Sequence, residues 1–315
     1  MDPSDRIFVA LDTSDLDKAL ALAEGLRGLV GGVKLGQEFF TAQGPAGVDA
    51  VTALGLPVFL DLKFHDIPAT VSRAVGAALA LKLFMLNVHA SGGEAMMWAA
   101  ADAAGLAGDE RPLVVAVTVL TSLWSGDLVA TGIDDNIEDQ VLRLAALAEN
   151  CDLDGVVCSP REVAALRRER GPDFKLVVPG IRPTWAAMDD QKRVETPADT
   201  VAAGADYLVI GRPITESQDP ADAARRIAGE VAGNRLRLVA AFVARHVQHT
   251  GGNQVGDIGA DAGIGDEHHP GAAIVEKAEP LIQGDLQVVV TGAALGQQPG
   301  HAIANDFADG DVFIV

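Results

Sequence analysis

The sequence predicts an α/β fold, a (β/α)₈ or TIM barrel over residues 1–230, followed by an atypical glycine-rich extension over residues 231–315. Short runs rich in Val, Ile and Leu recur along the first part, and longer Ala- and Leu-rich stretches of helical period lie between them. This alternation is typical of βα units around a parallel sheet. Eight such units in roughly 230 residues fit a closed barrel near the low end of its usual length. An open, doubly wound sheet is the alternative.

Eight strands are expected in this part of the chain. Each is a short, mainly apolar run bounded by polar residues, glycine or proline. The last strand ends near residue 210, so all of them precede the extension. In chain order they are Ile7–Leu11, Gly32–Leu35, Val58–Leu62, Phe84–Val88, Leu113–Thr118, Gly155–Cys158, Leu176–Pro179 and Tyr207–Ile210.

A helix is expected after each strand. The apolar residues of these stretches recur at helical spacing, and several stretches begin just after a Ser, Asp or Thr that can cap a first turn. A strand followed by a helix, repeated eight times, is the order of a (β/α)₈ barrel. The expected helices cover residues 15–28, 37–54, 67–81, 92–105, 136–149, 160–170, 196–203 and 217–230.

The composition changes near residue 231. The last 85 residues contain 13 glycines, three aromatic residues and five of the seven histidines, and the strand–helix alternation stops near His246. The structure of this extension is left open between three interpretations. It is a loosely ordered or disordered segment, a small accessory β unit using Leu286–Val290 and Val312–Val315, or a stretch translated beyond the natural end of the reading frame. Its histidines are too scattered to predict a metal site.

The charge balance restricts the partners. The formal net charge is −20 and the isoelectric point is near 4.6, which argues against nucleic acid or an anionic membrane as a partner. An anionic ligand would need a locally basic site. The two cysteines, Cys151 and Cys158, predict no disulfide framework, and no Cys/His cluster in the first 230 residues has metal-ligand spacing. The polar N-terminus and the lack of long apolar runs predict a cytoplasmic protein.

Five charged residues stand at the ends of the first three expected strands. Asp12 follows the first strand, Lys34 ends the second, and Asp61, Lys63 and Asp66 cluster at the third. Active sites of (β/α)₈ barrels lie at these strand ends, and residues i and i+2 of a strand share a face, so Asp61 and Lys63 are expected side by side. Any one of these charges alone would be a solvated residue or a structural ion pair. Five together are costly to desolvate unless they are paired and used, so they are candidate catalytic residues.

Residues after the seventh and eighth strands predict a phosphate site. Gly211 and Arg212 follow the eighth strand directly before a helix, where free backbone N–H groups and the helix dipole favour an anion. A strand end with a surface arginine is the simpler alternative. Arg182 lies in Pro179–Pro183 after the seventh strand, and a polar stretch that reaches Gln191 follows. This stretch is long enough for a lid from which Arg182 and Gln191 reach a bound phosphate.

The run Asp61-x-Lys63-x-x-Asp66-Ile67 resembles the signature of the orotidine 5'-monophosphate decarboxylase family. The Asp-x-Lys pattern alone is shared with a wider superfamily of phosphosugar decarboxylases, so a series of further motifs carries the resemblance. They match the bacterial branch in order over residues 6 to 230, whereas the extension has no counterpart in a typical member. The motifs are Leu11-Asp12, Val33–Gly36, Asn87–Ala90, Val117–Ser122, Pro179–Pro183 and Ile210–Pro213.

The resemblance implies decarboxylation of orotidine 5'-monophosphate to uridine 5'-monophosphate, the last step of de novo pyrimidine biosynthesis, without metal or bound cofactor. Lys63, held by Asp61 and Asp66, would stabilise a carbanion at C6 of the ring and then protonate it. Whether Asp61 raises the ground state by repulsion or mainly orients Lys63 stays open. The implied substrate-binding residues are Asp12 and Lys34 for the ribose, Thr121 for the pyrimidine edge, Gln191, Gly211 and Arg212 for the phosphate, with Arg182 and Pro179 nearby.

The resemblance also implies a homodimer in which Asp66 and Thr70 cross a two-fold interface and complete the partner's site. Two other functions are considered: a magnesium-dependent phosphosugar decarboxylase or epimerase on the same barrel, and a non-catalytic module that binds a phosphate ligand. Arg182, Gln191 and the Ile67-Pro68 continuation of the motif favour the nucleotide enzyme over the first. The second requires lost catalytic residues, and none of the expected ones is missing.

Overall fold

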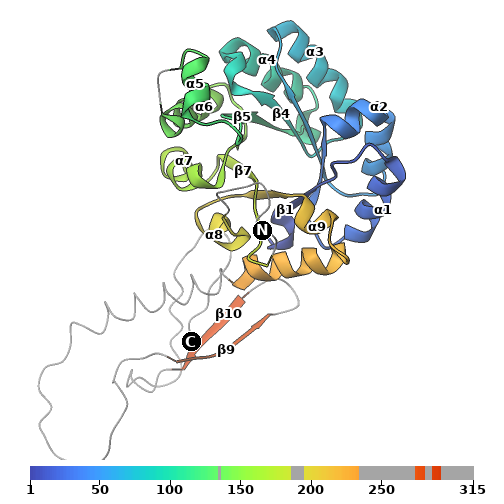
Figure 1. Cartoon of the computed structure of the whole chain (residues 1–315), viewed down its shortest axis with the longest axis vertical. Coiled ribbons are helices and arrows are strands. Elements are labelled where there is room, and N and C mark those ends of the chain that lie inside the picture. Colours follow the sequence, from blue (N-terminus) through green and yellow to red (C-terminus); the bar gives the residue numbers. More distant parts are fainter. Residues whose placement is uncertain (134–135, 186–194, 234–273, 281–285, 292–315) are drawn as a thin grey trace, which may run out of the picture. The chain divides into compact units, whose positions relative to one another are not determined.

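The computed structural model describes residues 1–133, 136–185 and 195–233, together with the backbone of residues 274–280 and 286–291. Eight parallel strands close into a barrel in chain order, with β8 paired to β1, and helices surround them (Figure 1). The predicted (β/α)₈ barrel is confirmed, and the open sheet is excluded. The strands are β1 (Ile7–Ala10), β2 (Gly32–Gly36), β3 (Val58–Phe64), β4 (Met85–His89), β5 (Leu113–Val117), β6 (Gly155–Val157), β7 (Lys175–Pro179) and β8 (Tyr207–Ile210).

Within the described residues, helices occupy all eight predicted positions, the last over residues 220–233. The helix predicted at 37–54 is broken at Gly44, whose φ of 61° is not helical and whose neighbour Pro45 has no N–H to donate. A short helix after β5 was not predicted. The other α-helices of the described residues are α1 (Leu16–Leu26), α2 (Gln37–Thr52), α3 (Pro68–Ala78), α4 (Glu94–Gly105), α5 (Ser125–Ala130), α6 (Ile137–Asn150), α7 (Val163–Arg170), α8 (Pro197–Ala202) and α9 (Arg212–Thr215). Short 3₁₀ helices cover Ser4–Arg6, Leu79–Leu81, Ala90–Gly92, Gly108–Glu110 and Pro160–Glu162.

The strands divide the core into two layers. Outward-facing residues such as Val9 and Leu35 pack against the helices in one large buried cluster. Inward-facing residues such as Phe8 and Phe59 form a second buried cluster inside the barrel. Because successive residues of a strand point to opposite faces, Asp61, two residues after Phe59, also faces inward, nearer the carboxyl end. The alternation therefore brings polar side chains to one mouth of a barrel whose interior is otherwise apolar.

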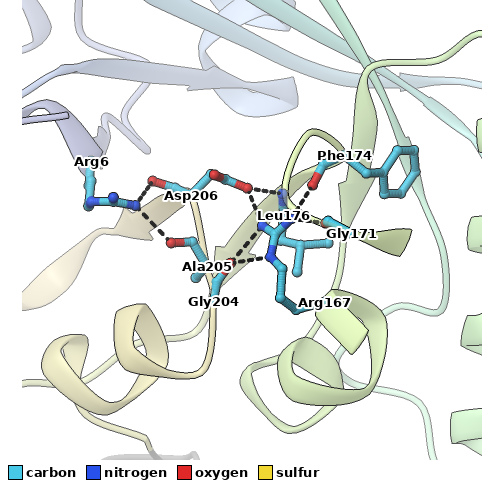
Figure 2. A network of polar contacts seen from close by, with 8 residues as sticks. All are labelled: Arg6, Arg167, Gly171, Phe174, Leu176, Gly204, Ala205 and Asp206. Atoms are coloured by element: carbon cyan, nitrogen blue, oxygen red, sulfur yellow. Dashed lines mark hydrogen bonds and ion pairs between the residues drawn. The ribbon is translucent and has the colours of Figure 1, made fainter. Parts of the chain in front are cut away.

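The amino end of the barrel is closed by a polar network around Arg167 and Asp206 (Figure 2). Asp206 directly precedes β8, and its carboxylate accepts hydrogen bonds from the Arg167 guanidinium at 2.6 Å and from the Leu176 N–H of β7 at 2.8 Å. Arg167, on α7, also donates to three backbone carbonyls. Every one of these contacts joins segments at the amino ends of β7 and β8. The remaining members of the network are Arg6, Gly171, Phe174, Gly204 and Ala205.

The same arrangement recurs two strands earlier. Asp154 directly precedes β6, and its carboxylate accepts from the Val114 N–H of β5 at 2.7 Å and from two nitrogens of Arg111. In both places an aspartate just before an even-numbered strand bridges to the preceding strand and pairs with an arginine. Polar groups at this end of the barrel therefore hold neighbouring strands together.

The extension contributes a separate two-stranded antiparallel sheet of β9 (Ile274–Pro280) and β10 (Leu286–Thr291). Contacts divide the chain into Met1–Asn234 and Arg235–Val315. β10 contains the expected strand at 286–290, but its partner β9 was not predicted, and the expected strand Val312–Val315 lies outside the described residues. No helix in the described part of the chain is long and apolar enough to span a membrane.

Candidate active site

A cavity of about 310 Å³ opens at the carboxyl ends of the barrel strands. Its walls combine apolar side chains from the strands with charged side chains from the strand ends, which is the usual make-up of a small-molecule site. Most of the residues singled out in the sequence meet here. Those that line the cavity are Asp12, Lys34, Asp61, Lys63, Thr121, Pro179, Arg182, Gly211 and Arg212.

Four of these side chains form a chain of alternating charge across β1, β2 and β3. Lys34 Nζ lies 3.1 Å from Asp12 Oδ1 and 3.2 Å from Asp61 Oδ2, and Lys63 Nζ lies 2.5 Å from Asp61 Oδ1. The parallel register explains the meeting of Lys34 and Asp61, because Gly36 at the end of β2 pairs with Asp61 on β3. Asp61 is thus the shared partner of both ammonium groups.

The electrostatics keep the central pair charged. Burial by itself raises the pKa of Asp61, but the ammonium groups of Lys34 and Lys63 and the hydrogen bonds from Lys63 and Asn87 outweigh it, so the pKa lies below its ordinary value. Burial likewise lowers the pKa of Lys34, but the carboxylates of Asp61 and Asp12 outweigh burial and raise it. Both groups therefore stay ionised around neutral pH although their side chains are largely buried.

Glycine at position 36 keeps room for this ion-pair chain. A Cβ atom placed there would lie 3.2 Å from Lys34 Nζ and 3.4 Å from Asp12 Oδ1. Even a methyl group at this position would crowd the Lys34 ammonium group, which would have to shift slightly. Gly36 therefore contributes to the site because it has no side chain. The sequence motif in which it lies does not reveal this role.

Asn87 is a polar neighbour of the site that the sequence analysis placed in a family motif but not among the site residues. It lies on β4 and is completely buried. Its amide nitrogen donates to Asp61 Oδ1 at 2.7 Å, and its amide oxygen accepts from the Lys63 backbone N–H at 2.8 Å. The signal was available, since Asn87 follows the interior residue Met85 by two positions and must face inward.

Two predicted site residues, Asp66 and Thr70, do not join the others within one chain. Asp66 is exposed, does not line the cavity, and accepts a hydrogen bond from the Ile67 N–H at 2.7 Å. Thr70, on α3, does not line the cavity either. Gln191 lies outside the described residues. Within one chain, Lys63 is therefore paired with Asp61 and not with Asp66.

The basic side of the cavity is formed by the loops after β7 and β8. Gly180 has a φ of 78°, a left-handed conformation that glycine adopts without strain, and the chain turns there toward the buried Arg182. Gly211 follows β8 and precedes Arg212, the first residue of α9. Two guanidinium groups from neighbouring strand ends thus line one cavity, so the locally basic site expected in this acidic protein exists.

The family model described as orotidine 5'-phosphate decarboxylase / HUMPS family matches residues 5–227. The chain belongs to this family. The match covers the whole barrel, including all eight strands and the lined cavity.

Similar proteins agree with this placement. The orotidine 5'-phosphate decarboxylase of Paramagnetospirillum magneticum is 54% identical over 229 residues, which are 71% of this chain and 97% of that protein. The one from Rhodospirillum rubrum is 56% identical over 72% of this chain and 94% of its own length. The crystal structure of the enzyme from Lactobacillus acidophilus superposes with a TM-score of 0.63 at 36% identity, covering 71% of this chain and 98% of that one. These family members correspond in length to the barrel.

Proposed function

We propose that the chain decarboxylates orotidine 5'-monophosphate to uridine 5'-monophosphate, the last step of de novo pyrimidine biosynthesis. The observation that carries the proposal is the chain Asp12–Lys34–Asp61–Lys63 in a cavity that two arginines also line. The basic side suits the 5'-phosphate, and the ammonium groups suit a reaction that develops negative charge on carbon. The sequence is more than 50% identical to two proteins named orotidine 5'-phosphate decarboxylase, over nearly their whole length, which supports the same activity.

In the proposed reaction, the bond between C6 and the carboxyl carbon breaks and its electron pair remains on C6. The Lys63 ammonium stabilises this carbanion and then transfers one proton to C6, which leaves carbon dioxide, uridine 5'-monophosphate and a neutral amine that regains its proton from water. Lysine suits this role better than arginine, since a guanidinium group does not readily release a proton. The short contact of Lys63 with Asp61 supports an orienting role for that carboxylate.

The remaining cavity residues are assigned to binding. Asp12 and Lys34 would hold the ribose hydroxyls, and Thr121 the edge of the pyrimidine ring. Gly211 and Arg212 would bind the 5'-phosphate, joined by Gln191, with Arg182 and Pro179 nearby. Binding energy from the phosphate, far from C6, would then be available for the chemical step, because remote contacts can offset the free energy of orientation and desolvation.

The site is proposed to be completed by a second copy of the chain. Asp66 and Thr70 lie at the start of α3 without lining their own cavity, and Ile67 beside them is 66% exposed, which is unusual for an isoleucine. In a two-fold dimer this segment would reach the partner's cavity, and the contact would be reciprocal. Each site would then combine Lys63 of one chain with Asp66 of the other.

Subunit exchange tests the shared site. Lys63→Ala and Asp66→Asn are each expected to be inactive. A heterodimer of the two has one site with both substitutions and one site with neither, so mixing should restore activity, to about half the wild-type value per heterodimer by this counting. Mass spectrometry measures the exchange. If heterodimers form and no activity returns, Asp66 acts within its own chain and the shared-site proposal is wrong.

The activity itself is tested by following the ultraviolet absorbance of orotidine 5'-monophosphate in the presence of EDTA. Turnover is expected to continue, because Lys63 supplies the cation and the proton. Loss of turnover with EDTA and recovery with magnesium would favour the phosphosugar-type enzyme, and binding without turnover would favour the non-catalytic module. Both cavity carboxylates are already paired with lysines, which leaves them poorly placed as magnesium ligands.

A further inference from the structure

Asn87 occupies an irregular place in the barrel. Leu60 of β3 pairs with Leu86 of β4, and Phe64 pairs with Val88, so three residues of β3 stand opposite the single residue Asn87. A regular parallel pair would have one residue on each strand between these points. The extra residues form a bulge, a feature that re-aims side chains and interrupts the backbone ladder.

We propose that Asn87 is a positioning residue that holds this bulge and thereby fixes Asp61 and Lys63 in their reactive arrangement. The inference rests on the proposed function, since it concerns the lysine that would protonate C6. Asn87 does not line the cavity, so it acts through the two charged residues and not on the substrate.

The first contact replaces a missing backbone partner. Lys63 has a φ of 54°, a left-handed conformation that is unfavourable for a residue with a side chain. Its backbone N–H, released from the ladder by the bulge, donates to the amide oxygen of Asn87 at 2.8 Å. Because a buried N–H without a partner is costly, this bond stabilises the backbone conformation from which the lysine side chain starts.

The second contact fixes the carboxylate. Asp61 Oδ1 accepts from both Asn87 Nδ2 and Lys63 Nζ, while Oδ2 faces Lys34. The contacts close a ring, from the Lys63 backbone through the Asn87 amide and the Asp61 carboxylate to the Lys63 ammonium. The amide fits in one orientation alone, since the reverse would place its NH₂ against an N–H and its oxygen against a carboxylate.

Few side chains could make both contacts of Asn87. Position 87 must present an acceptor and a donor from one planar group, and its strand position leaves space for the length of asparagine. Leucine has a similar size but neither function. Aspartate keeps the acceptor, and regains the donor only when its carboxyl group is protonated.

The first experiment compares Asn87→Leu with the wild type in the decarboxylation assay. The kcat is expected to fall on the order of 10- to 100-fold, the effect typical of losing a group that orients a reactive side chain, with KM changed less than about threefold. Thr118→Val is the matched control. Thr118 directly follows β5, and its hydroxyl donates a buried hydrogen bond to the Val157 carbonyl of β6, away from the charged chain. The kcat of this control should stay within about twofold of the wild type.

The second experiment uses Asn87→Asp, which keeps nearly the same shape. The ionised carboxyl at position 87 would repel Asp61, whereas the protonated one restores both hydrogen bonds. The ratio of variant to wild-type kcat should therefore rise as the pH falls. Asn87 contacts Asp61 and Lys63 on β3, while Lys34 on β2 pairs with Asp61 and His89 on β4 interacts with both β3 residues. These groups are the same in both proteins, so their effects largely cancel in the ratio.

Thermal unfolding of all variants separates positioning from folding. A kcat of Asn87→Leu within twofold of the wild type would overturn the inference, and so would a loss matched by Thr118→Val with an equal loss of stability. If Asn87→Leu does not fold, a pH-independent ratio for Asn87→Asp overturns it instead. The wild-type protein in the same assay tests the proposed function separately. If the wild type shows no decarboxylase activity, the proposed function itself is wrong.

Discussion

The two ends of the barrel both carry aspartates paired with cations, but they satisfy them differently. At the amino end, Arg167 and Asp206 are paired with each other and with backbone groups (Figure 2). Their hydrogen bonds therefore serve to join neighbouring strands. At the carboxyl end, Lys34, Asp61 and Lys63 are paired mainly with each other and line a cavity. The difference teaches that an aspartate paired with a basic side chain stabilises the fold when backbone groups complete its hydrogen bonds, and remains available for a ligand when they do not.

The choice of cation follows the same division. The amino end uses arginine, whose planar fork reaches several carbonyls at once and keeps its charge. The centre of the carboxyl end uses lysine, whose compact ammonium can give up a proton. Among the described residues, the arginines that line the cavity are Arg182 and Arg212, on its β7 and β8 side, where we propose that the phosphate is held.

The largest expected effect is at Lys63. Lys63→Ala should lower kcat by at least about 10⁴-fold while substrate or product binding weakens much less, as expected for a contact strongest in the transition state. The thermal midpoint should change little, because Asp61 keeps Lys34 and Asn87 as partners. Lys18→Ala, at an exposed position on α1, is the control. Near-normal turnover of the Lys63 variant would contradict the assignment of this end to catalysis.

Arg212 is expected to have the next largest effect. Arg212→Ala should lower kcat/KM by a factor that corresponds to a loss of about 2–5 kcal/mol of transition-state stabilisation. This is the magnitude expected when a desolvated charged pair loses one partner. Added guanidinium ion should restore part of the activity with orotidine 5'-monophosphate and none with the substrate that lacks the phosphate. Equal rescue with both substrates would show that Arg212 does not bind the phosphate.

At the amino end the same type of change should alter stability and not turnover. Arg167→Ala leaves Asp206 and several carbonyls without their donor, so the free energy of unfolding should fall by about 3 kcal/mol, measured by urea denaturation. Arg111→Ala should lower it by about 1 kcal/mol or less, because the Arg111 side chain is 40% exposed and its pair with Asp154 is screened. The kcat of folded protein should be unchanged in both. A loss of kcat without a loss of stability would remove the contrast between the two ends.

The smallest effect is expected from removing the extension. We propose that the barrel folds without it, since a closed barrel leaves no strand edge to cover. A chain that ends at Ala232 should stay soluble with turnover within about twofold of the full chain, measured in the same ultraviolet assay. Aggregation of the shortened chain would show that residues 233–315 cover part of the barrel.

The sequence by itself determined the order of strands and helices and the strand ends at which the charges stand. Buried parallel strands are mainly apolar, so the charges at Asp12, Lys34 and Asp61 indicated where each strand approaches its carboxyl end. The structure continues β2 and β3 past these charges, to Gly36 and Phe64. Alternation also identifies the inward face, and applied to β4 it would have found Asn87. The local signals were weaker at two places. The prediction missed the short helix α5, and it gave α2 as one continuous helix without the break after residue 43.

Only the tertiary structure decided how these residues meet. The pairing of Gly36 with Asp61, the three-against-one bulge at Asn87 and the left-handed backbone of Lys63 depend on the register of strands that are far apart in the sequence. So does the bridge from Asp206 to β7 at the other end. Register is fixed by closing the barrel and packing its two layers at once, a condition on all eight strands together that no local pattern of residues encodes.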